Sequence, residues 1–172
     1  MDGWKPYYNA GAVLAALGLA LSAWSHVAAL MGMRGPLGAA TILLPLGAFV
    51  VWIPAALVAR RLTKGTEGKD YWNAAFTGCP PWMKHLVFGL AGYALLNFFL
   101  VLLVLPPPKS AILGSMTPEK VRGFSGSCMA FYGAAMAILY SGPQPNERQC
   151  PQGHKIGPLA RRCEECGYYW DA

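Results

Sequence analysis

Four long stretches of the chain contain no lysine, arginine, aspartate or glutamate, and they constrain the fold more than any other feature. They cover residues 6–33, 35–59, 85–108 and 123–146. Each exceeds the roughly 20 residues that a helix needs to cross about 30 Å of hydrocarbon. Soluble domains have about 25% charged residues, whereas this chain has only 13%. The sequence therefore predicts an all-α integral membrane protein. It excludes a soluble enzyme domain, a disordered chain and a disulfide-stapled secreted module.

Prolines and glycines set the limits of the expected helices. A Gly-Pro turn at 35–36 reverses the chain, and three prolines at 106–108 end a helix. Thr117 is a suitable N-cap, with Pro118 at the first helical position of the last helix. We therefore expect a transmembrane four-helix bundle in residues 1–146. Its predicted spans are about 9–33, 37–59, 84–105 and 118–141.

Basic residues are distributed unequally between the two ends of this bundle. One end would hold the N-terminus, the loop 60–84 and the C-terminal tail, with ten basic residues: Lys5, Arg60, Arg61, Lys64, Lys69, Lys84, Arg148, Lys155, Arg161 and Arg162. The other end would hold four: Arg34, Lys109, Lys120 and Arg122. Because cytoplasmic loops carry the excess of Lys and Arg, we predict cytoplasmic N- and C-termini in a plasma or inner membrane. Anionic lipids at the cytoplasmic face are the expected partners of the net charge of +6.

The loop 60–84 contains a short amphipathic pattern. On a helix at about 69–78, one face would carry Tyr71, Trp72, Ala75 and Phe76, with polar residues opposite. A Trp-containing helix flanked by basic residues is typical of segments that lie in the headgroup plane. We therefore expect an interfacial helix here.

The C-terminal tail, residues 147–172, contains the one specific chemical motif. Cys150-Pro-Gln-Gly-His154 is followed, after eight residues, by Cys163-Glu-Glu-Cys166-Gly. Two pairs of ligands in tight turns can complete a tetrahedral shell around Zn²⁺. Because this segment is too short to bury a hydrophobic core of its own, metal binding would supply its folding free energy. We predict one structural zinc ion, bound by the cysteine–histidine pair of the first turn and the cysteine–cysteine pair of the second. The alternative is a redox-active Cys163/Cys166 pair.

This segment resembles the short zinc-ribbon family, in which a Cys-Pro-x-Gly-His or Cys-Pro-x-Cys-Gly knuckle faces a Cys-x-x-Cys-Gly knuckle. The resemblance covers about residues 148–170 and implies that Cys150, His154, Cys163 and Cys166 are the ligands. Four protein ligands make a closed structural site with no open position for catalysis. The membrane region resembles no family of known function.

Polar and small residues within the spans have two interpretations each. His26 and Asn97 either take part in function or hydrogen-bond to neighbouring helices. Small residues at intervals of three or four predict close helix packing, within one chain or between chains: Ala12, Ala16 and Ala20; Gly126 and Ala130; Gly133 and Ala137.

The sequence contains no nucleophile–base pair, phosphate-binding loop or paired carboxylates, so we do not expect an enzyme. We expect a non-catalytic multi-pass adaptor or accessory subunit. Its helices would bind a membrane-protein partner or self-associate in the lipid bilayer, and its zinc ribbon would dock to a cytoplasmic protein. Nucleic acid is not favoured, because the charges of the tail cancel. The alternative is a homo-oligomeric pore or small-solute transporter, lined by His26, Asn97, Ser125, Ser127 and Tyr132.

Overall fold

Four long helices dominate the computed structural model, which describes residues 5–33, 40–104, 118–143 and 148–169. They are α1 (Lys5–Leu30), α2 (Ala40–Leu62), α4 (Pro81–Val104) and α5 (Pro118–Ser141). Each is long and apolar enough to cross a membrane. The predicted set of four long apolar helices is therefore confirmed.

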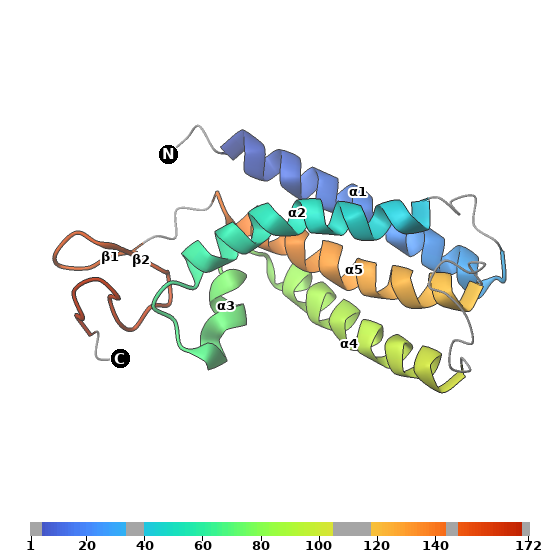
Figure 1. Ribbon diagram of the computed structural model, residues 1–172. Coiled ribbons are helices and arrows are strands. Elements are labelled where there is room, and N and C mark those ends of the chain that lie inside the picture. The colour runs from blue at the N-terminus through green and yellow to red at the C-terminus, as the bar shows by residue number, and fades with distance from the viewer. Residues whose placement is uncertain (1–4, 34–39, 105–117, 144–147, 170–172) are drawn as a thin grey trace.

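The shorter elements lie at one end of this bundle (Figure 1). A 3-10 turn, η2 (Gly68–Asp70), and a short helix, α3 (Tyr71–Ala75), connect α2 to α4. Two antiparallel strands, β1 (Arg148–Gln149) and β2 (Lys155–Ile156), follow α5. The start of α1 and the ends of α2 and α5 lie at this same end (Figure 1).

Helix α5 is the central helix of the bundle. It packs against α1, α2 and α4 (Figure 1). Half of the most apolar 18-residue stretch of α5 is buried, against 11% of the corresponding stretch of α4. Helix α4 therefore contacts the bundle along one narrow face and leaves most of its large apolar side chains exposed.

Small residues bring α1 close to α5, and part of the predicted pattern takes part in this packing. Gly126 of α5 is buried beside the His26 ring of α1, and Gly133 and Ala137 of α5 are buried as well. The buried positions of α1 are spaced by four and three residues alternately, as at Ala15, Gly18 and Ser22. Ala16 and Ala20, which belong to the predicted stripe, are exposed. A strict spacing of four drifts around a helix of 3.6 residues per turn, whereas the alternating spacing stays on one side.

The helix ends differ by a few residues from the expected limits. Helix α1 ends at Leu30, where Gly32 has a φ of 70°. The amides of Gly32 and Met33 donate to the carbonyls of Ala29 and Ala28, which closes the helix in a Schellman motif. Helix α4 begins at Pro81 rather than at about 84, because proline is well suited to the first turn of a helix.

Helix α3 lies within the segment where an interfacial helix is expected, and two of the four residues on the predicted face pack against the bundle. Ala75 and Phe76 are buried against the bundle, whereas Tyr71 and Trp72 are exposed. The Trp72 ring stacks on that of Phe76, with 5.6 Å between centroids. Ala75 and Phe76 thus lie on one side of the segment, as the pattern predicts, and that side faces the bundle.

Candidate metal centre

The first half of the centre is a tight turn between β1 and β2. Cys150 opens this turn, and its carbonyl accepts a hydrogen bond from the Gly153 amide at 2.8 Å. The Cys150 amide in turn donates to the His154 carbonyl at 3.0 Å. Gly153 has a φ of 82°, a left-handed conformation that glycine adopts at no steric cost. The sequence Cys-Pro-Gln-Gly-His thus forms a closed knuckle.

The second half repeats the same construction. The Gly167 amide donates to the Cys163 carbonyl at 2.9 Å, and the Cys163 amide donates to the Tyr168 carbonyl at 2.8 Å. Gly167 has a φ of 73°. An isolated antiparallel bridge between Arg162 and Tyr169 closes the base of the turn. Both knuckles therefore present a cysteine from a turn that a glycine makes possible.

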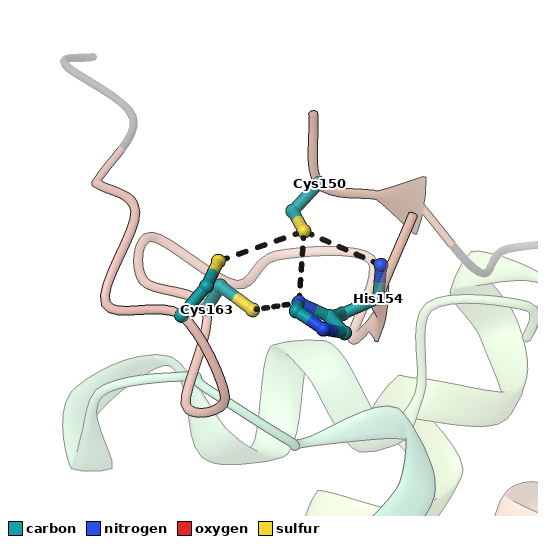
Figure 2. Close-up of side chains that lie close together, drawn as sticks. Cys150, His154 and Cys163 are labelled. Carbon is teal, nitrogen blue, oxygen red and sulfur yellow. Dashed lines mark hydrogen bonds between the residues drawn. The ribbon is translucent and has the colours of Figure 1, made fainter. Parts of the chain in front are cut away.

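The two knuckles bring four ligand atoms together. The sulfur of Cys150 lies 3.4 Å from Nδ1 of His154 and 3.7 Å from the sulfur of Cys166. Nδ1 of His154 lies 3.7 Å from the sulfur of Cys163. Figure 2 shows Cys150, His154 and Cys163 pointing toward one another. All four ligand atoms lie within 4.8 Å of one another, so the cluster could hold a metal ion.

These separations match the edges of a tetrahedral site. With metal–sulfur and metal–nitrogen bonds of about 2.3 and 2.0–2.1 Å, tetrahedral angles place two sulfurs about 3.8 Å apart and a sulfur and a nitrogen about 3.6 Å apart. A disulfide needs about 2.05 Å between sulfurs, and all five cysteines of the chain are free. The donor set and its spacing therefore fit a metal ion.

The surroundings of Cys163 favour its thiolate. Burial opposes ionisation, but hydrogen bonds from the backbone and thiol of Cys166 outweigh it and lower the pKa of Cys163 to about 6. The pKa of Cys166 is raised, because burial and its contacts with Cys163 and Cys150 outweigh a hydrogen bond from the Tyr168 backbone. The thiolate is the form that binds a metal.

The tail is docked on the end of α2. The amides of Gly157 and Arg161 donate to the carbonyls of Lys64 and Gly65, both at 3.2 Å. In the opposite direction, the Gly65 amide donates to a carboxylate oxygen of Glu164 at 2.9 Å. The cluster of candidate ligands is thus joined to the helical bundle by hydrogen bonds as well as by the chain. The sequence patterns did not predict this docking.

Replacing Gly65 with alanine is expected to loosen the docked tail. A Cβ at this position would lie 2.4 Å from the Arg162 carbonyl oxygen, and the φ of 73° disfavours any side chain. Hydrogen exchange at the Gly157 and Arg161 amides should become at least severalfold faster, because these amides bond to the displaced loop. Gly68→Ala is the matched control, since a Cβ there meets no atom within 4 Å. Equal exchange rates in the two variants would contradict this account.

Three of the polar residues considered for a solute path come together at the other end of the bundle. The ring of His26, in α1, bonds through Nδ1 to the Ser125 hydroxyl at 3.1 Å and through Nε2 to the Tyr93 hydroxyl. Asn97 accepts from Nε of Arg122 at 2.9 Å and donates to its carbonyl at 3.1 Å. No sequence pattern connects Tyr93 or Arg122 with His26, because the three residues lie on three different helices.

The other two candidates lie elsewhere. Ser127 donates to the Gly123 carbonyl of its own helix and lines an apolar groove between α2 and α5. The Tyr132 hydroxyl donates to the Leu44 carbonyl at 2.8 Å. The five polar residues therefore do not form one continuous lining within a single chain.

Comparisons with known proteins found no similar protein. The chain gives no significant match to any protein-family model, curated protein or solved structure. Interpretation of its function therefore rests on the geometry of the metal centre and of the bundle.

Proposed function

We propose that the protein is a non-catalytic membrane adaptor or accessory subunit with four transmembrane spans. The exposed surface of the long helices supports membrane insertion, because it carries large apolar side chains such as Leu57, Phe99 and Leu103. The basic residues gather at the end that bears α3 and the ribbon, which supports a cytoplasmic location for that end. The membrane would be the plasma or inner membrane, with anionic lipids at this face.

The ion that the ligand set favours is Zn²⁺. Three thiolates and one imidazole at tetrahedral spacing are a typical structural zinc set, and a closed shell leaves no position for a substrate. The residues that would hold it are Cys150, His154, Cys163 and Cys166. Bound zinc would supply folding free energy to a segment whose core otherwise consists of little more than Ile156 and Ala160.

The observation that carries the adaptor proposal is the position of this closed centre. It is fixed against the end of α2 by the bonds of Gly65, Gly157 and Arg161. A ribbon held in one orientation at the membrane surface is suited to docking a cytoplasmic protein. The narrow contact of α4 with the bundle leaves a long apolar face that suits a helix of a membrane-protein partner or of a second copy.

The pore alternative is less well supported. His26, Asn97 and Ser125 bond to groups of the same chain, so their polar atoms are occupied within the bundle. Asn97 and His26 are also almost fully buried. A path between chains would need these groups to face a partner copy or water.

The adaptor proposal is tested by identifying proteins that remain bound after gentle extraction from the native membrane. We expect a defined companion with the wild-type chain and its loss from the Cys163→Ser/Cys166→Ser double variant. Cys128→Ser is the control, because Cys128 is buried in α5 outside the ribbon. Proteoliposomes of the pure chain should show no solute flux. A companion that binds the double variant equally, or flux that His26→Ala abolishes, would contradict the proposal.

A further inference from the structure

His154 faces two different groups through its two ring nitrogens. Nδ1 points to the sulfurs of Cys150 and Cys163. Nε2 lies 3.7 Å from a carboxylate oxygen of Glu165. Glu165 belongs to the opposite knuckle, between Cys163 and Cys166 in the sequence. The imidazole therefore lies between the ligand cluster and a carboxylate.

The same carboxylate reaches the end of α2. Its other oxygen, Oε1, lies 2.5 Å from Nζ of Lys64. Lys64 follows the last residue of α2 by two positions, and its carbonyl accepts the docking bond from Gly157. A continuous series of contacts thus runs from the end of a membrane helix through Lys64, Glu165 and His154 to the cluster.

We propose that Glu165 and Lys64 form the outer shell of the metal centre and couple metal binding to the docking of the ribbon on α2. Both are positioning residues, because they act on the metal through His154. The inference rests on the proposed metal site and adds to it a mechanism by which the state of the centre is transmitted to the membrane helices.

The physical basis is the preference of a metal-bound imidazole for a partner on its second nitrogen. A carboxylate there fixes the tautomer and the ring orientation, and loss of such a partner typically weakens metal binding about 10–100-fold. In this protein the carboxylate is itself held by Lys64. Any contact that orders Glu165 against α2 therefore favours metal binding, and by linkage bound metal favours docking to the same extent.

Glu164 provides an internal comparison. Its carboxylate accepts the Gly65 amide at 2.9 Å, and so contributes to docking at the same loop. It precedes Glu165 in the same knuckle, but the structure shows no contact from it to His154 within the described residues. Glu164→Gln should weaken docking and leave the hydrogen-bond environment of Nε2 unchanged, whereas Glu165→Gln should alter both.

The first experiment measures Co²⁺ and Zn²⁺ affinity of the full chain in detergent by competition with a chelator. We expect Glu165→Gln to bind about tenfold more weakly or worse, and Lys64→Met to bind severalfold more weakly. Lys69→Met is the matched control, since Lys69 pairs with Glu67 on the surface of the same loop. ¹⁵N NMR of His154 in the Zn²⁺-loaded chain should show a changed Nε2 signal in Glu165→Gln and the wild-type signal in Glu164→Gln.

The second experiment tests the coupling from the other direction. Removing the metal from the wild-type chain should speed hydrogen exchange at the docking amides of Gly65, Gly157 and Arg161. Wild-type metal affinity and an unchanged His154 signal in Glu165→Gln would overturn the outer-shell assignment. Equal hydrogen exchange at the Gly65 amide with and without metal would overturn the coupling. A wild-type chain that binds neither Co²⁺ nor Zn²⁺ would overturn the proposed metal site itself.

Discussion

Replacing Cys163 and Cys166 together with serine is expected to abolish metal binding and to unfold the ribbon while leaving the helical bundle intact. Two of four ligands are lost, and structural zinc sites of this size contribute on the order of 10–16 kcal/mol of apparent binding free energy to folding. Within the part of the chain that the structure describes, the ribbon buries only Ile156, Gly157 and Ala160 besides its cysteines.

Three measurements on the purified chain check this result. Bound metal should fall from one ion per chain to none, the amides of residues 148–169 should lose their protection from exchange, and helical circular dichroism should change little. Cys79→Ser serves as the control, because this thiol bonds to the Ala137 carbonyl near the same end of the bundle. A protected tail in the metal-free double variant would show that the ribbon folds without metal.

The second large effect is expected from Gly18→Ile. A Cβ at Gly18 would lie 2.2 Å from Cε1 of Tyr132. The Tyr132 ring is buried, and its hydroxyl donates to the Leu44 carbonyl. The ring can therefore move aside only by losing that bond. Its hydroxyl also lies close to Gly47 of α2, where an added Cβ would be 2.5 Å from the hydroxyl oxygen. We expect destabilisation at the upper end of the 1–3 kcal/mol typical of overpacking, about 3 kcal/mol or more.

Unfolding of the full chain in a detergent titration, followed by helical circular dichroism, measures this loss. Ala20→Ile is the matched control, since Ala20 lies on the same helix and is exposed. Its effect should stay within about 0.5 kcal/mol. Equal stability of the two variants would mean that α1 and α5 do not pack as described.

The four helices and the two knuckles were predictable because each has a signal within a short stretch of sequence. Absence of charge over more than 20 residues predicts a long apolar helix, and the glycines that follow Cys150 and Cys166 predict the turns that bring the candidate ligands together. The limits of the helices were less predictable. A proline is compatible both with the first turn of a helix and with the segment before it, so the start of α4 at Pro81 could not be assigned from the sequence.

Contacts between distant segments were not predictable from one sequence. The α1 helix is apolar on most sides, so hydrophobic periodicity did not show that Gly18 rather than Ala16 faces α5. The bonds of Glu165 with Lys64, and of His26 with Tyr93, join residues that are 101 and 67 positions apart. Such pairs have no periodic pattern and become visible only when the fold brings the segments together.

The most direct test of the account is native mass spectrometry of the chain gently extracted from its own membrane. It measures bound metal, copy number and companions together. We predict one zinc ion per chain and at least one further, larger membrane protein in the complex. A chain without metal would contradict the ribbon as a metal centre, and a closed ring of identical chains without a companion would contradict the accessory role and favour a pore.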